Sequence, residues 1–234
     1  MALMNADIAT VAALIGEPSR AAMLDALMAG EALPASALAR WAGVAPSTAS
    51  GHLARLLDGG LVACESVGRE RHYRLASADA ADALEALSRL ARPTRVSSLH
   101  AAGRAAAIRE ARTCYDHLAG RVGVGVTDAL VARRALILGD GSYALTRQGE
   151  DLLVRLGADV ASAREGRRAF ARVCIDWSER RPHLAGALGA AVADALFANG
   201  WLKHCPNDRT LTVTPAGAAG LGRELGIEVG RTAA

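Results

Sequence analysis

The sequence lacks the features that mark secreted, membrane-spanning and disulfide-stabilised proteins. It has no basic start followed by an apolar run and a cleavage site. No stretch of about 18 residues is free of charges and helix breakers, as a membrane span requires. Its four cysteines are widely spaced and form no Cys-x-x-Cys pair. These absences predict a cytoplasmic protein with no membrane contact, whose cysteines are reduced.

Common catalytic motifs are also missing. The chain contains no Gly-x-Ser-x-Gly, no paired-carboxylate motif and no Walker loop, and residues 120–125, GRVGVG, do not match Gly-x-Gly-x-x-Gly. We therefore expect no catalytic residue. An enzyme fused to a binding domain is the lower alternative, and turnover of a ligand would distinguish it.

The composition favours a helical protein of two small domains. Aromatic residues make up only 3% of the 234 residues and hydrophobic residues 51%, with Ala, Leu and Arg abundant. These three residue types have high helix propensity, because their side chains lose little conformational entropy in a helix. The length fits two domains better than one, and the net charge of +3 is a weak sign of an anionic partner.

The first ninety residues show the pattern of a helix-turn-helix. Helices are expected over residues 5–15, 18–29, 34–41 and 46–58, with Gly43 in the turn between the last two. Two short helices joined by a Gly-containing turn form this motif. The leading face of the fourth helix carries side chains that can bond phosphates and base edges. We expect its DNA contacts to be Ser47, Thr48, Ser50, His52 and Arg55.

A β-wing follows the fourth helix. Residues 61–65 and 72–76 read as short strands, and SVGRER between them reads as the turn. Arg69 and Arg71 at its tip suit the phosphate backbone or the minor groove. With a further helix over residues 78–91, the order is that of a winged helix-turn-helix.

These motifs resemble the ArsR family of bacterial winged-helix regulators over about residues 5–92. The resemblance implies a homodimer that binds a pseudo-palindromic double-stranded DNA operator, usually as a repressor controlled by an effector. Two metal sites common in the family have no ligands here, because the helix over 34–41 has no Cys, His or acid and the helix over 78–91 has no His. The matching positions are Pro18, Arg20, Leu24, Leu27, Ser47, Ser50, His52, Leu53, Leu56, Gly60, Leu61, Val62, Gly68, Arg69, Tyr73 and Leu75.

The second half of the chain reads as an internal repeat. His-Leu-Ala-Gly begins at His117 and again at His183, an offset of 66 residues (183 − 117) that aligns much of the two copies. Each copy, about residues 112–160 and 178–229, reads as a helix, a β-hairpin and a helix capped by Thr146 or Thr214. We expect residues 1–95 to form the DNA-binding domain. Residues 96–234 should form an effector and dimerisation domain of two half-winged-helix-like units about a pseudo-twofold axis, joined by a helix over 161–179. The fold class is then mainly α with small β-wings.

The histidine and cysteine residues of the repeat are candidate metal ligands. Cys114 and His117 are expected on one helix face, and Cys174 and His183 could complete a soft Cys₂His₂ site. Against a metal ion, the constant offset places Cys114 opposite Arg180, so the cysteines do not repeat. Redox sensing by Cys114 is a further alternative.

A small-molecule cleft is the other candidate in this half. His117, Trp177, Arg180 and His183 combine an aromatic ring with cations that suit an anionic effector. Alternatively, Trp177 is part of the core and the arginines are solvated. The sequence thus predicts a dimeric repressor with an effector site in its second half, and leaves open a metal or thiol response and a protein-docking role.

Overall fold

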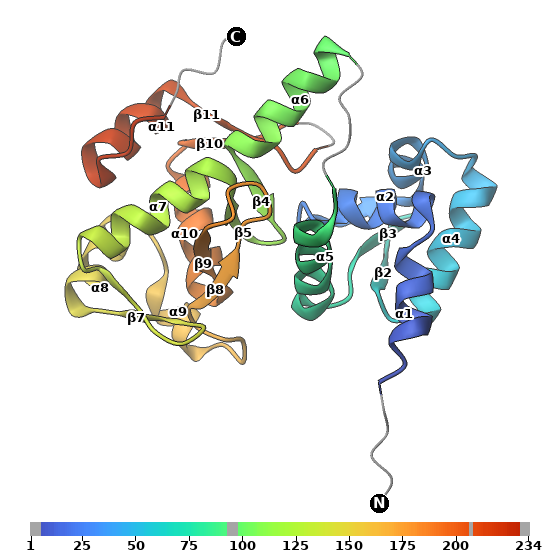
Figure 1. Cartoon of the computed structure of the whole chain (residues 1–234), viewed down its shortest axis with the longest axis horizontal. Helices are drawn as coiled ribbons and strands as arrows, with labels where there is room; N and C mark the ends of the chain where they lie inside the picture. Colours follow the sequence, from blue (N-terminus) through green and yellow to red (C-terminus); the bar gives the residue numbers. More distant parts are fainter. Residues whose placement is uncertain (1–5, 93–97, 206–207, 230–234) are drawn as a thin grey trace, which may run out of the picture. The chain divides into compact units, whose positions relative to one another are not determined.

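The computed structural model describes residues 6–92, 98–205 and 208–229. The chain forms two compact units, Met1–Leu84 and Glu85–Ala234 (Figure 1). They divide within helix α5 (Ala78–Leu90), whereas the boundary expected at residues 95–96 lies outside the described residues. None of the described helices is long and apolar enough to span a bilayer.

The N-terminal unit is a winged helix-turn-helix, as the sequence predicts. Helix α4 begins with Pro46 in its first turn and buries Ala49, Leu53 and Leu56, which share one face, while Gly43 makes the turn before it with a φ of 66°. Three antiparallel strands form a sheet in the order β1-β3-β2. The elements are α1 (Ile8–Ile15), α2 (Pro18–Leu27), β1 (Leu33–Pro34), α3 (Ala35–Ala42), α4 (Pro46–Asp58), β2 (Val62–Val67), β3 (Glu70–Leu75) and the first half of α5.

The C-terminal unit repeats one order of elements: hairpin, helix, hairpin, helix. The first set follows α6 (Leu99–Glu110) and comprises β4 (Arg112–Cys114), β5 (His117–Ala119), α7 (Gly120–Ala132), β6 (Leu136–Leu138), β7 (Tyr143–Leu145) and α8 (Arg147–Arg155). The second set follows α9 (Val160–Glu165). It comprises β8 (Arg172–Ile175), β9 (Pro182–Ala185), α10 (Gly186–Ala198), β10 (Leu202–His204), β11 (Leu211–Val213) and α11 (Pro215–Gly220), which continues into the π-helical turn η1 (Leu221–Leu225).

The first hairpin of each set corrects the sequence prediction. Cys114 and His117 do not share a helix face; they pair across the β4–β5 hairpin, with Tyr115 in its turn at a φ of 64°. The helix expected over residues 161–179 ends at Glu165, and β8 follows it. Gly120 and Gly186, with φ values of 75° and 82°, stand between the second strand of each hairpin and the helix that follows it.

The two sets pack reciprocally, with α7 on β9, α10 on β5, and β5 beside β9. The recurring glycines permit close packing of each helix on the strand before it. A Cβ at Gly123 would lie 2.5 Å from the Leu118 carbonyl oxygen, and one at Gly189 would lie 2.7 Å from that of Leu184. At both glycines the nearest atoms belong to the strand of the same set, and at Gly189 the Cβ of His117 from the other set follows at 3.2 Å.

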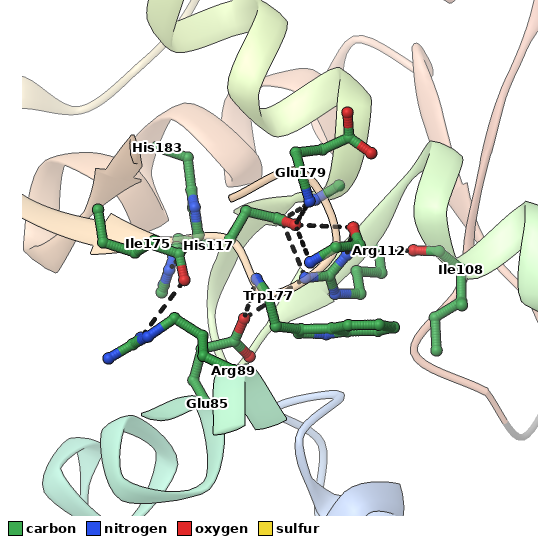
Figure 2. A network of polar contacts seen from close by, with 12 residues as sticks. Glu85, Arg89, Ile108, Arg112, His117, Ile175, Trp177, Glu179 and His183 are labelled. Atoms are coloured by element: carbon green, nitrogen blue, oxygen red, sulfur yellow. Dashed lines mark hydrogen bonds and ion pairs between the residues drawn. The ribbon is translucent and has the colours of Figure 1, made fainter. Parts of the chain in front are cut away.

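A buried arginine joins the two hairpins to α5 (Figure 2). Arg112 is 0% exposed, and its Nη2 lies 2.9 Å from Asp176 Oδ2 and 3.4 Å from Glu85 Oε1. Its Nη1 donates to the Ile108 carbonyl oxygen and to Ser178 Oγ at 3.3 and 3.2 Å. The guanidinium therefore connects α5, α6, β4 and the β8–β9 turn within this unit.

Asp176 is the partner that balances this charge. Its Oδ2 accepts from the Gly120 amide at 2.6 Å, and its Oδ1 accepts from the amides of Ser178 and Glu179 at 2.8 and 2.9 Å. Burial alone would raise the pKa of Asp176, but the Arg112 guanidinium and these hydrogen bonds hold it well below its ordinary value. The carboxylate therefore stays ionised in the folded protein.

The hairpin-to-helix junctions also match the sequence prediction. Thr146 Oγ1 accepts from the Gly149 amide at 3.0 Å, and Thr214 Oγ1 accepts from the Gly217 amide at 2.9 Å. Each glycine lies against backbone: a Cβ would be 2.2 Å from the Ala135 carbonyl oxygen at Gly149 and 2.1 Å from that of Trp201 at Gly217. Only glycine fits at either position.

Replacing Asp176 by Asn is expected to lower the free energy of unfolding by about 3 kcal/mol, because it leaves the Arg112 charge buried with a weakened partner network. Urea denaturation measures the loss. Asp140→Asn, in the exposed β6–β7 turn, should change stability by less than about 0.5 kcal/mol. If the two variants lower the free energy of unfolding equally, the buried Arg112–Asp176 pair contributes no more to stability than an exposed carboxylate.

Gly149→Ala and Gly217→Ala are each expected to destabilise the protein by about 2 kcal/mol, because the new methyl group must displace backbone. Thermal unfolding provides the comparison. Gly103→Ala is the matched control, since no atom lies within 4 Å of a Cβ built there in α6, and alanine should stabilise that helix by up to about 1 kcal/mol. A neutral result at both junction glycines contradicts the packing described.

Candidate functional site

Helix α4 presents polar side chains on the face opposite its buried leucines. Ser47, Thr48, Ser50 and Arg55 are all exposed, as the sequence predicts for the leading face of a recognition helix. Small hydroxyl side chains let a helix approach base edges closely, and Arg55 adds a charge toward the end of the helix.

The wing, formed by β2 and β3, follows this helix in the sequence and carries exposed arginines. Arg69 and Arg71 are both exposed, and Gly68 makes the tight turn at the tip with a φ of 63°. Arg71 Nε donates to Cys64 Sγ at 3.2 Å, and its guanidinium carbon lies 5.5 Å from the centroid of the Tyr73 ring. Cys64 and Tyr73 thus orient Arg71, which lies in β3 opposite Ser66 and not in the turn as predicted, because the turn consists of Gly68 and Arg69 alone.

The structure places His52 differently from the other expected DNA contacts. Its side chain is 14% exposed, and its Nδ1 lies 3.5 Å from both Glu17 Oε2 and Arg20 Nη1. Arg20 in turn donates to the carbonyl oxygens of Leu14 and Ala13 at 2.6 and 2.8 Å. His52 therefore links α4 to α2 and does not extend the exposed polar face.

The C-terminal unit brings together the four residues that the sequence analysis named as metal ligands. The ligand atoms of Cys114, His117, Cys174 and His183 all lie within 4.8 Å of one another. All four residues are buried, with 2%, 3%, 7% and 0% of their surface exposed. We call them the Cys-His cluster.

Strand register shows that the two halves of the cluster are equivalent, although a constant sequence offset does not align their cysteines. Cys114 pairs with His117 across one hairpin, and Cys174 pairs with His183 across the other. The cysteines are 60 residues apart (174 − 114) and the histidines 66 (183 − 117), because the second turn is six residues longer. The cysteines do repeat, so the argument that Cys114 lies opposite Arg180 is wrong.

The two imidazoles face each other at the centre. His117 Nε2 lies 3.2 Å from His183 Nε2, and the ring centroids are 5.1 Å apart. His117 Nδ1 lies 3.4 Å from Asp116 Oδ1, and the other oxygen of that carboxylate accepts from Arg168. Burial opposes protonation of the His117 ring, yet Asp116 and Cys174 raise its pKa above the ordinary value.

The two thiols differ in their electrostatic surroundings. The hydrogen bond from Cys114 lowers the pKa of Cys174 well below its ordinary value, and the two imidazoles lower it further although burial opposes them. The bond to Cys174 and burial raise the pKa of Cys114 in return. One thiolate shared between two sulfurs and two imidazoles has the chemistry to hold a soft metal ion or to oxidise to a disulfide.

Trp177 and Arg180, the other expected effector contacts, lie apart from the cluster's centre. The Trp177 ring stacks on Arg112, whose guanidinium carbon is 4.8 Å from its centroid (Figure 2). Arg180 is exposed in the β8–β9 turn at a φ of 56°. Sequence reasoning considered Arg112 only as a cation near Cys114 and missed its ion pairs with Asp176 and Glu85. The only signal was that Glu85 follows the buried Ala81 by one helical turn.

The chain is similar to a known domain family in its N-terminal part and to a known regulator over most of its length. A helix-turn-helix domain model matches residues 15–65. The HTH-type transcriptional regulator YdfF of Bacillus subtilis (strain 168), itself uncharacterized, is 40% identical over 226 residues, which cover 97% of this chain and 100% of YdfF.

Two solved structures share part of the chain. The homodimeric winged helix-turn-helix domain of Mb0332 from Mycobacterium bovis, a possible ArsR-family regulator, is 30% identical, with a TM-score of 0.33 over 38% of this chain and 88% of that one. NolR from Sinorhizobium fredii is 26% identical, with a TM-score of 0.34 over 38% of this chain and 96% of that one. With the winged helix-turn-helix described above and a relative that aligns over 97% of this chain, the chain belongs to the HTH-type transcriptional regulators and is a DNA-binding regulator.

Proposed function

We propose that the protein is a dimeric repressor that binds a pseudo-palindromic operator and is controlled by an effector in its C-terminal unit. The observation that carries this proposal is the division of α4 into two faces. Leu53 and Leu56 are buried, while Ser47, Thr48, Ser50 and Arg55 face solvent with no packing role. A helix anchored in this way presents a rigid polar surface to the major groove.

Each expected contact has a distinct place in this proposal. The exposed residues of α4 contact base edges and phosphates, and Arg69 and Arg71 of the wing bind the backbone or the minor groove. His52 acts indirectly, because its contacts with Glu17 and Arg20 fix the position of α4 on α2.

An exposed apolar helix supports the dimer, and we place the contact between copies there, in the N-terminal unit, and not in residues 96–234 as expected from the sequence. Helix α1 has the sequence IATVAALI and no buried residue, and Ile8 and Val11 are 73% and 41% exposed. A monomer in water gains nothing from such a surface, whereas a second copy would cover it. The two recognition helices of the dimer would then lie about 34 Å apart on one side of the DNA.

The C-terminal unit supplies the effector response. Its two sets of hairpins and helices, with reciprocal packing of α7 on β9 and α10 on β5, are consistent with repeated units about a pseudo-twofold axis. An effector at their junction alters DNA affinity only if it binds one arrangement of the dimer better than another. The Cys-His cluster lies between the two sets and is our candidate for that junction.

Arg69→Ala combined with Arg71→Ala is expected to weaken binding to every DNA sequence and to reduce the slope of log affinity against log salt by about 2, because two phosphate contacts are lost. Fluorescence anisotropy measures this on a duplex selected by the protein from a random library and on an unrelated duplex. Arg147→Ala with Arg155→Ala, exposed on α8, removes the same charge elsewhere. If both double variants lose affinity equally, the wing has no specific role.

Val11→Glu is expected to weaken dimerisation about 100-fold, because it brings charges of one sign into the apolar contact between copies. Analytical ultracentrifugation should show a dimer for the wild type and a 24.1 kDa monomer for the variant at the same concentration. Val154→Glu, at a 56% exposed position of α8, should remain dimeric. A wild-type monomer, or a dimer of Val11→Glu, contradicts the assignment of α1.

A further inference from the structure

We propose that Cys114, His117, Cys174 and His183 bind one Zn²⁺ ion in tetrahedral coordination and thereby tie hairpin β4–β5 to hairpin β8–β9. The metal site stands on the geometry of these residues and is independent of operator binding. Its role as the effector site does rest on the proposed function.

The distances fit the ion. Zinc–nitrogen bonds of about 2.0 Å and zinc–sulfur bonds of about 2.3 Å place tetrahedral ligand atoms roughly 3.3 to 3.8 Å apart. The two imidazole nitrogens are already 3.2 Å apart, and no pair of ligand atoms in the cluster exceeds 4.8 Å. Small side-chain rotations on fixed strands complete the coordination sphere.

The charges also fit the ion. The ligand atoms of two cysteines and two histidines lie within 4.8 Å of one another, in residues that are at most 7% exposed. Burying thiolate and imidazole groups costs free energy of folding unless hydrogen bonds or a cation compensate them. A divalent cation with two thiolates and two neutral imidazoles gives a site with no net charge, which a dry interior accepts.

The donor set selects zinc over harder cations. Thiolate and imidazole ligands in tetrahedral S₂N₂ geometry suit Zn²⁺, whereas Mg²⁺ and Ca²⁺ require oxygen ligands. Four protein ligands leave no open position for a substrate. A closed site is typical of zinc that holds structure together, so its effect is on the arrangement of the two hairpins.

A carboxylate behind one ligand orients it toward the metal ion. Asp116 Oδ1 lies 3.4 Å from His117 Nδ1, and Arg168 holds the same carboxylate from its other oxygen. Such a partner fixes the tautomer in which Nε2 is free to bind the metal. Asp116 is thus a positioning residue, because it acts through His117.

The cluster and the hydrogen-bond network of Arg112 share the same two hairpins. Cys114 ends the strand that begins with Arg112, and Cys174 precedes Asp176 by two residues in the other hairpin. Arg112 also bonds Glu85, in the part of α5 that belongs to this unit. Zinc that fixes the two hairpins therefore also fixes the charged groups that hold the end of α5.

The first experiment is metal analysis of the full chain with Co²⁺ as a spectroscopic substitute. The wild type should bind one metal ion per chain and show the thiolate charge-transfer and intense d–d bands of tetrahedral cobalt. Four substitutions should each lower zinc affinity more than about 100-fold, which exceeds the effect of losing a group that only orients a ligand: Cys114→Ser, Cys174→Ser, His117→Gln and His183→Gln. Cys64→Ser, Cys205→Ser and His204→Gln are matched controls that should retain full binding.

Four results overturn the proposal, of which three concern metal binding. They are an absence of metal in protein purified without chelators and then offered zinc, octahedral cobalt bands, and loss of binding in the control variants. A Cys114–Cys174 disulfide that persists in reduced buffer with zinc also overturns it. If a ligand variant fails to fold, the cobalt spectrum of the wild type still decides.

The second experiment tests the positioning residue. Asp116→Asn should lower zinc affinity about 10-fold while leaving the cobalt bands of the tetrahedral site unchanged. Asp128→Asn, an exposed carboxylate paired with Arg181, is the control and should not change affinity. An altered spectrum for Asp116→Asn, or an equal effect of the control, removes Asp116 from this role.

A third measurement separates the metal site from its regulatory use. Operator affinity of the chain with and without one equivalent of Zn²⁺ should differ at least about 5-fold if zinc is the effector. A bound zinc ion that leaves operator affinity unchanged overturns the effector role and leaves the metal site standing. Failure to bind any DNA overturns the proposed function instead.

Discussion

The buried charge of Arg112 is the constraint on which the C-terminal unit depends. An arginine side chain stays protonated in a protein interior, so the fold must bring carboxylates to it. Asp176 comes from the opposite hairpin and Glu85 from α5, with Nη2–oxygen distances of 2.9 and 3.4 Å. Meeting this requirement brings the two hairpins face to face. Cys114 and Cys174, each two residues from a member of the pair, are thereby placed in one cluster.

Both units use β-hairpins, but the side chains that these hairpins carry lie in different environments. In the N-terminal unit, a helix and a hairpin keep their polar side chains in solvent, where phosphates and base edges can reach them. In the C-terminal unit, hairpins direct Cys and His inward, where water is excluded. The polar side chains of the one unit thus meet solvent, whereas the Cys and His side chains of the other lie against each other.

The sequence predicted the parts of the fold that local chemistry determines. Pro46, Gly43, Thr146 and Thr214 mark helix ends through their own conformation and hydrogen bonds, and the structure confirms them. It named the four residues of the cluster but placed Cys114 and His117 on a helix, because the turn between them uses Tyr115 at a φ of 64°, which few non-glycine residues adopt. The Arg112–Asp176 pair spans 64 residues and has no local signal.

X-ray absorption spectroscopy at the zinc edge tests the central claim most directly, since it counts and identifies the atoms around the ion. The account predicts two sulfur atoms at about 2.3 Å and two imidazole nitrogens at about 2.0 Å in the zinc-loaded wild type. Cys174→Ser should lose one sulfur from that shell, and Cys64→Ser should lose none. A shell of oxygen and nitrogen atoms alone would contradict the account.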